Sequence, residues 1–157
     1  MIRLLTGSTH TGKTLLAQRL LERHGAPYLS IDHLKMGLIR SGMCPLTPES
    51  TDEALTAVLW PVVREIVKTA VENGQSLTVE GCYIPFNWRE DFDASCLPHI
   101  RFLCLVFSEA YIRTRFDTIQ THANAIERRK DDSFCTMELL LAENRRNLEA
   151  CRRRGLP

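Results

Sequence analysis

Eight residues near the start of the chain constrain its fold more than any other feature. They read Gly-Ser-Thr-His-Thr-Gly-Lys-Thr and fit the pattern G-x-x-x-x-G-K-[ST] at every fixed position. An apolar run, residues 2–6, directly precedes them, and leucines at helical spacing follow in residues 15–21. Glycines allow successive backbone N–H groups to turn inward around a phosphate, and the following helix points its positive end at the same place. The stretch therefore predicts a strand, a phosphate-binding loop and a helix, in that order.

Three residues of this loop have individual roles in the prediction. We expect Lys13 to reach the β- and γ-phosphates of a nucleotide, and Thr14 to ligate a magnesium ion. His10 occupies a position where the pattern allows any residue, and we interpret it as a loop surface residue rather than a ligand or base. The predicted cofactor-binding residues of the loop are Gly7, Ser8, Thr9, His10, Thr11, Gly12, Lys13 and Thr14.

The composition is that of one domain without a strong overall charge. The 157 residues include 20 basic and 19 acidic side chains, a net charge of +1, which argues against a nucleic-acid or anionic-membrane partner. The six cysteines form no C-x-x-C pair and no zinc spacing, a usage typical of a reduced cytosolic protein. The sequence contains neither a signal peptide nor an apolar run of membrane-spanning length. We therefore expect a soluble, cytoplasmic protein.

Apolar periodicity alternates along the chain between strand and helix patterns. Strands are expected over residues 2–6, 28–31, 76–80 and 100–107, and helices over residues 13–24, 34–40, 50–73, 88–92, 109–125 and 137–153. The 50–73 helix begins with a capping box at Ser50 and contains Pro61, which should kink it. We expect Asp132 or Ser133 to cap the last helix, and the very hydrophobic 100–107 strand to lie at or near the sheet centre. The alternation predicts a single α/β domain, a parallel sheet with helices on both faces.

Two acidic residues stand at the ends of predicted strands, Asp32 and Glu80. Ligands of an open parallel sheet bind beyond the carboxyl ends of its strands, so both acids and the loop should meet at one crevice. One carboxylate can take a proton from an acceptor hydroxyl, while the other can hold magnesium through water or position the acceptor. The alternative for Asp32 is an N-cap of the helix expected to begin near Leu34.

Other motifs narrow the class of phosphate-binding protein. A signalling or translational GTPase would carry D-x-x-G and N-K-x-D motifs, and the chain has neither. A motor or AAA-type ATPase would normally have a longer chain. The loop, the S-x-D-x-x-K stretch of residues 30–35, the E-G-x-x-x-P stretch of residues 80–85 and a later basic helical segment together resemble the small P-loop kinases of the nucleoside, adenylate and shikimate kinase superfamily. Within it they are most similar to zeta-toxin-like and 2-phosphoglycerate-kinase-like proteins.

The resemblance implies a fold and an activity. The fold is a three-layer P-loop NTPase fold with strand order 2-3-1-4, although this sequence ends where a fifth strand would begin. The activity is the transfer of the γ-phosphoryl group of ATP, with Mg²⁺, to a hydroxyl of a small-molecule acceptor. Asp32 maps to the general base, and Lys35 to the cation that contacts an anionic part of the acceptor. A lid segment, about residues 113–132, would supply arginines to the phosphoryl group.

These considerations give a full set of predicted site residues. The predicted catalytic residues are Lys13, Asp32, Arg128 and Arg129. The predicted cofactor-binding residues are the loop and Arg113, and the predicted metal-binding residues are Thr14 and Glu80. The predicted acceptor-binding residues are Asp32, Lys35, Arg40, Glu80 and Tyr83.

Three alternatives stay open at this stage. In a nucleoside monophosphate kinase, Lys35 and Arg40 would form part of a cation clamp and no base would be needed, so Asp32→Asn should be mild. The protein could also be a non-catalytic regulatory or toxin-like module. Such a module would bind ATP without turnover, and its missing fifth strand would make it depend on a partner. A polynucleotide 5′-kinase is disfavoured by the near-zero net charge. The sequence assigns neither the acceptor, the base preference nor the oligomeric state.

Overall fold

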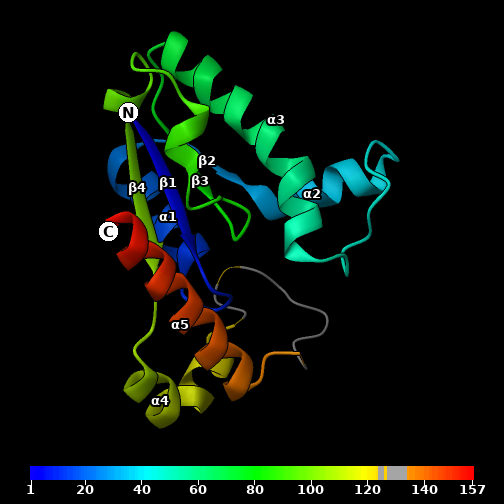
Figure 1. The fold of residues 1–157 in the computed structure, drawn as a ribbon, viewed down its shortest axis with the longest axis vertical. Coiled ribbons are helices and arrows are strands. Elements are labelled where there is room, and N and C mark those ends of the chain that lie inside the picture. The colour runs from blue at the N-terminus through cyan, green and yellow to red at the C-terminus, as the bar shows by residue number, and fades with distance from the viewer. Residues whose placement is uncertain (124–125, 127–133) are drawn as a thin grey trace.

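A parallel sheet of four strands lies at the centre of the described part of the molecule (Figure 1). The structure is a computed structural model that describes residues 1–123, 126 and 134–157. Its strands are β1 (Ile2–Gly7), β2 (Tyr28–Ser30), β3 (Leu77–Glu80) and β4 (Ile100–Leu105). Their spatial order is β2-β3-β1-β4, and every neighbouring pair is parallel. The predicted order is therefore confirmed, and no strand follows the last helix within residues 134–157.

Helices cover both faces of the sheet, which confirms the predicted three-layer arrangement. They are α1 (Lys13–His24), α2 (Ile31–Arg40), α3 (Asp52–Glu72), α4 (Glu109–Thr121) and α5 (Met137–Arg154), with 3₁₀ turns at Trp88–Asp91 and Leu97–His99. In Figure 1, α5 crosses in front of β1 and β4, whereas α1 lies behind the sheet. Parallel strands need crossover connections, and a helix in such a connection packs back onto a sheet face.

The main hydrophobic core lies between the sheet and α3. Leu4 of β1 and Val79 of β3 are paired in register and belong to the same buried cluster as this helix. From α3, the buried residues Leu59, Val63 and Val67 recur every four residues and so share one face. Burying each such side chain stabilises the fold by about 1.5–3 kcal/mol. This packing holds the carboxyl ends of β1 and β3 in fixed positions.

A smaller apolar cluster joins α4 to α5. Its buried members are Ile112, Ile119, Cys135 and Leu140. Beside it, the buried side chain of Asn144 accepts a hydrogen bond from the Phe107 backbone N–H at 2.7 Å and donates one to the Leu140 carbonyl at 2.7 Å. The cluster and this amide fix α5 relative to the segment that follows β4.

The expectation from apolar content that the 100–107 strand lies at or near the sheet centre is wrong, because β4 lies at an edge, as the strand order 2-3-1-4 implies, and ends at Leu105. The side chains of β4 alternate between buried and more exposed positions along Ile100–Leu105. Phe102 is buried, whereas Arg101 and Leu103 are exposed, Leu103 by 41%. The strand therefore covers only one sheet face with its apolar side chains. A long apolar run does not by itself distinguish such an edge strand from a central one.

The boundary between β2 and α2 differs from its prediction. The strand stops at Ser30, and the helix begins at Ile31 rather than near Leu34. Asp32 therefore lies in the first turn of α2, and Ser30 occupies the N-cap position with an extended backbone. Asp32 is neither a strand-end residue nor an N-cap. The β-branched side chain of Ile31 favours a strand locally, but a carboxylate in the first helical turn stabilises a helix start.

The two other predicted helix caps also move. Thr51, not Ser50, caps α3, since its hydroxyl accepts a hydrogen bond from the Ala54 N–H at 3.3 Å. The hydroxyl of Ser50 instead accepts one from the Thr47 N–H at 3.0 Å. Thr136 caps α5. In each case, a hydroxyl residue next to the predicted region has the extended backbone that a cap requires.

The helix that contains Pro61 is not divided by it. A proline removes one backbone hydrogen bond of a helix, yet α3 continues as one helix across Pro61. In the described part of the chain, no helix combines the length and apolar composition that a membrane span requires.

Candidate active site

The loop between β1 and α1 has a backbone that only certain residues can adopt. Gly7 has a φ of +142°, and a Cβ placed there would overlap the carbonyl oxygen of Leu105 on β4. Gly12 has a φ of +82° and directly precedes the first residue of α1, Lys13. Both glycines are therefore required by conformation, the first also by the close approach of β4. The loop ends at the amino end of a helix, as anion binding requires.

Hydrogen bonds inside the loop converge on the carbonyl of Ser8. This oxygen accepts one from the Thr11 hydroxyl at 2.8 Å and another from the Lys13 ammonium at 2.7 Å. Ser8 and Lys13 are 3% and 8% exposed. The Lys13 ammonium is thus held against the backbone of the loop it belongs to.

His10 is more integrated in the protein than a surface loop residue. It is half-buried and adopts a left-handed backbone with a φ of +62°, which is uncommon for a residue other than glycine. Its Nδ1 lies 2.9 Å from the hydroxyl of Thr9 and 3.5 Å from the sulfur of Cys135, which immediately precedes the cap of α5. The loop is therefore in contact with the chain that enters α5.

Two α5 side chains that the sequence analysis missed also contact the loop. Asn147 donates a hydrogen bond to the Ser8 hydroxyl at 3.0 Å. Glu143 accepts one from the Thr9 backbone N–H at 3.3 Å. The two residues are four apart on one helix and so face the same way. More than 130 positions separate them from the loop, and no motif marks them, although their i,i+4 spacing within a predicted helix was visible.

Asp32, Lys35 and Tyr83 come together beside the sheet edge. The Lys35 ammonium lies 2.7 Å from an Asp32 carboxylate oxygen and donates a hydrogen bond to the Tyr83 hydroxyl at 2.9 Å. Burial alone lowers the pKa of Lys35, but the charge of Asp32 and these two hydrogen bonds together outweigh it and raise the pKa. Lys35 is 12% exposed and Asp32 43% exposed. The lysine is therefore a fixed cation, while the carboxylate keeps an open side.

The end of β3 lies between this group and the loop. Glu80 pairs in register with Leu5 of β1 and Ser30 of β2 and is 1% exposed. The Cys82 thiol, two residues further on, donates a hydrogen bond to the Gly7 carbonyl at 3.4 Å.

Cys82 also links the two groups electrostatically. Solvent reaches its side chain, yet protein surrounds the thiol closely enough that burial raises its pKa. The positive charge of Lys13 opposes this rise, and the negative charge of Asp32 adds to it. Lys13 follows β1 and Asp32 follows β2, the two neighbours of β3, so both groups lie beyond the same end of the parallel sheet.

Comparison with solved structures identifies the fold. A deoxyadenosine kinase from M. mycoides superposes with a TM-score of 0.58 and 11% identity over 99% of this chain and 85% of its own. A shikimate kinase from Bacteroides thetaiotaomicron gives a TM-score of 0.54 and 14% identity over 99% and 80% of the two chains. The chain has the P-loop kinase fold. A structure of the Pnkp1/Rnl/Hen1 RNA repair complex gives a TM-score of 0.59 at 11% identity. The match covers 97% of this chain but only 45% of the chain in that complex, so this chain spans less than half of its length.

Sequence comparisons add no narrower family. No family model matches the chain, and the search of curated proteins found no match. At identities this low, structural likeness shows the P-loop kinase fold and not the acceptor. The similarity to zeta-toxin-like and 2-phosphoglycerate-kinase-like proteins stays a prediction.

In the described part of the chain, the structure records no contact between a predicted site arginine and the P-loop. Arg113 pairs with Glu109 at 2.8 Å on the exposed side of α4, and it is 55% exposed. Arg40 is the last residue of α2 and is exposed. Arg128 and Arg129 lie outside the described residues. The nucleotide- and acceptor-binding roles of these arginines stay predictions.

Metal binding by this fold does not depend on a cluster of protein ligands. Among the described residues, no group of three or more His, Cys, Asp or Glu side chains is arranged to hold a metal ion. A P-loop holds magnesium mainly through its Ser or Thr hydroxyl and the phosphates themselves. Thr14 is the second residue of α1 and is half-buried, and its role as a magnesium ligand stays a prediction.

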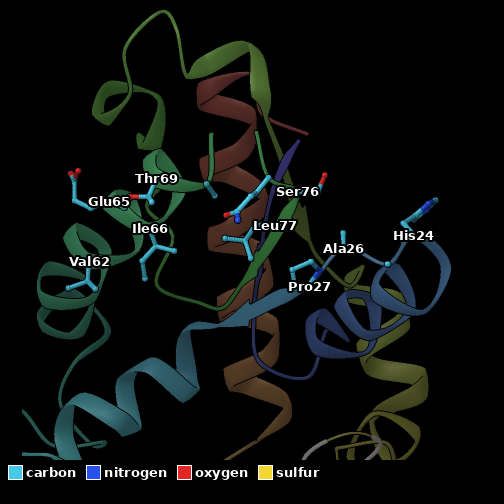
Figure 2. A pocket seen from close by; sticks show the side chains of 12 residues that line it. His24, Ala26, Pro27, Val62, Glu65, Ile66, Thr69, Ser76 and Leu77 are labelled. Carbon is cyan, nitrogen blue, oxygen red and sulfur yellow. The ribbon is translucent and has the colours of Figure 1, made fainter. Parts of the chain in front are cut away.

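A hollow of about 960 Å³ lies away from this site (Figure 2). Val62, Glu65, Ile66 and Thr69 of α3 form one wall, and Figure 2 shows Ala26 and Pro27 across from them. The hollow borders the amino ends of β2 and β3, whereas the P-loop follows the carboxyl end of β1. Parallel strands put these ends on opposite edges of the sheet, and none of the predicted site residues lines the hollow.

Proposed function

We propose that this protein transfers the γ-phosphoryl group of ATP to a hydroxyl of a small-molecule acceptor. The observation that carries the proposal is that Lys13 and Asp32 follow the carboxyl ends of β1 and β2, the two strands that flank β3 in the parallel sheet. A phosphate-binding lysine and a partly open carboxylate near a common space are the two groups that an alcohol kinase needs.

The P-loop fits the phosphates of a nucleotide and its magnesium ion. Gly7 and Gly12 give the loop its curvature, and the amino end of α1 adds a positive dipole. The Lys13 ammonium would contact the β- and γ-phosphates, either giving up its hydrogen bond to the Ser8 carbonyl or keeping it alongside the phosphate contacts. The Thr14 hydroxyl would hold the magnesium ion. Magnesium, when bound, neutralises charge that develops on the phosphate oxygens.

Asp32 would act on the acceptor. As the acceptor oxygen attacks the γ-phosphorus, its proton passes to the Asp32 carboxylate, a new P–O bond forms and the bond to the β-phosphate oxygen breaks. ADP leaves with the electron pair, and the proton returns to solvent from Asp32. Lys35 orients this carboxylate through their 2.7 Å contact, and Tyr83 in turn holds Lys35. We assign Glu80, buried at the end of β3, to holding hydrated magnesium or positioning the acceptor.

The arrangement of cations favours an alcohol over a nucleoside monophosphate. A phosphate acceptor needs several unengaged cations that converge on it. Lys35 is already paired with Asp32, and Arg40 lies five residues further along α2. Five residues of α-helix turn about 140° around the axis, so these two side chains leave α2 on different sides and form no single clamp.

The test is ADP release from Mg·ATP with a panel of alcohols, sugars, glycerate derivatives and nucleoside monophosphates. We expect acceptor-dependent turnover that Lys13→Ala abolishes and Asp32→Asn lowers by about 10²–10⁴-fold, the usual contribution of a general base. Glu72→Gln, which removes a carboxylate at an exposed position at the end of α3, is the control and should retain full activity. Turnover with nucleoside monophosphates that survives Asp32→Asn would instead support a nucleoside monophosphate kinase. ATP binding without turnover for every acceptor would support the non-catalytic module.

A further inference from the structure

The P-loop is braced from outside by α5. Asn147 and Glu143 lie one helical turn apart and contact consecutive loop residues, the Ser8 hydroxyl at 3.0 Å and the Thr9 N–H at 3.3 Å. A third contact, 3.5 Å between Cys135 and His10, involves the residue that follows Thr9. Three successive loop residues are thus held by one short part of the chain, residues 135–147.

The braced residues are the ones that arrange the phosphate-binding groups. The Ser8 carbonyl accepts hydrogen bonds from both Thr11 and Lys13, so the position of Ser8 sets the position of the Lys13 ammonium. Asn147 therefore acts on Lys13 through Ser8. Neither Asn147 nor Glu143 belongs to the P-loop motif.

The brace itself is firmly anchored. Leu140 of α5 is fully buried against α4, and Cys151 of α5 is buried in the main core. Between them, Asn144 holds the Phe107 N–H at 2.7 Å. A helix fixed at several points loses little further entropy when its side chains hold a loop, so it can keep that loop in one shape.

We propose that Asn147 and Glu143 are positioning residues that hold the P-loop in its nucleotide-binding shape before nucleotide arrives. Glu143 acts here as a hydrogen-bond acceptor for the loop backbone, and its charge is not what the loop requires. A preformed loop need not be ordered by the ligand, so affinity for nucleotide should fall when the brace is cut. The affinity part of this inference rests on the proposed ATP binding, whereas the part that concerns loop shape does not.

A double-mutant cycle on Mg·ATP affinity tests the Asn147 contact. We expect Asn147→Ala and Ser8→Ala each to raise Kd about five- to tenfold, the usual effect of losing one partner of a hydrogen bond that is shielded from solvent. The double variant should be no more than about twofold weaker than either single one, because both changes remove the same contact. Glu149→Ala, at an exposed position on α5, should leave Kd unchanged. An Asn147→Ala Kd within twofold of wild type, or fully multiplicative effects, would overturn the proposal.

Amide hydrogen exchange tests the Glu143 contact without nucleotide. We expect the Thr9 N–H to exchange roughly tenfold faster in Glu143→Ala than in wild type, and at the wild-type rate in Glu143→Gln, whose amide oxygen still accepts a hydrogen bond. If Glu143→Gln binds Mg·ATP more tightly than wild type does, the carboxylate competes with phosphate, and the positioning role is refuted. If wild type binds no Mg·ATP, the proposed function fails, while the exchange rate of Thr9 still decides whether the brace exists.

Discussion

Replacing Gly7 with alanine should strongly destabilise the protein. At a φ of +142°, a residue with a side chain is strained by about 1–3 kcal/mol. The new Cβ would also overlap the Leu105 carbonyl oxygen and lie 3.1 Å from the Leu105 nitrogen. These are backbone atoms of β4 directly opposite Gly7 in the sheet, so they cannot rotate away as a side chain would. Forcing strands apart in a packed interior costs a further ~1–3 kcal/mol.

The expected total is a loss of about 2–6 kcal/mol of unfolding free energy, a large part of the stability of a typical domain. The matched control is Gly37→Ala, because Gly37 lies inside α2 and its added Cβ would meet nothing within 4 Å. That change should stabilise the protein by about 0.5–1 kcal/mol through helix propensity. Urea denaturation of wild type and both variants measures the difference. If Gly7→Ala costs less than about 1 kcal/mol with an unchanged m-value, the close approach of β4 to the loop is not as described.

Three further outcomes are expected. Thr51→Ala should lower the unfolding free energy by about 1 kcal/mol in urea denaturation, whereas Ser50→Ala should change it by less than half of that, since Thr51 caps α3; equal effects would contradict this cap assignment. Asn144→Ala should cost about 2–4 kcal/mol in the same assay, because it leaves the Phe107 N–H without its acceptor beside a new cavity, and a loss under 1 kcal/mol would refute this role. Cys82 is the exposed cysteine, and its raised pKa leaves less thiolate at pH 8, so iodoacetamide should alkylate it more slowly than it does in the urea-unfolded chain. The alkylation rate of Cys82, followed by mass spectrometry, should therefore reach half of its maximum at a pH above about 8.5, the usual thiol pKa. A midpoint at the usual thiol pKa would contradict the raised pKa of Cys82.

Local chemistry explains why most of the fold could be predicted. The loop from Gly7 to Thr14 and the helix ending before Gly25 have their structure specified by nearby residues, so their boundaries match the prediction. The α2 boundary does not match, because Ile31 is compatible with both a strand and a helix and the decision depends on how Ser30 pairs with Glu80 of β3. The apolar content of residues 100–107 misplaced β4 for a similar reason, because the neighbours of a strand are set by the whole sheet; the strand order implied by the resemblance placed it correctly at the edge.

The candidate site divides in the same way. The motif identified Lys13 and the loop, and strand ends pointed to Asp32 and Glu80. The sequence did not reveal that Lys35 would pair with Asp32, although their i,i+3 spacing on a helix permits it once the helix is known to begin at Ile31. The contacts of Asn147 and Glu143 with the loop had no local signal, because they join residues more than 130 positions apart.

The phosphate-binding loop, the alternation of strands and helices and the parallel sheet could all be read from consecutive residues. They depend on backbone preferences and apolar periodicity, which act over a few positions of the chain. Three features required the folded molecule: the start of α2 at Ile31, the binding of Lys35 to Asp32 and Tyr83, and the support of the P-loop by α5. Such contacts depend on how distant segments share one packed volume, and the free energy that selects them belongs to the folded chain as a whole rather than to any one stretch of it.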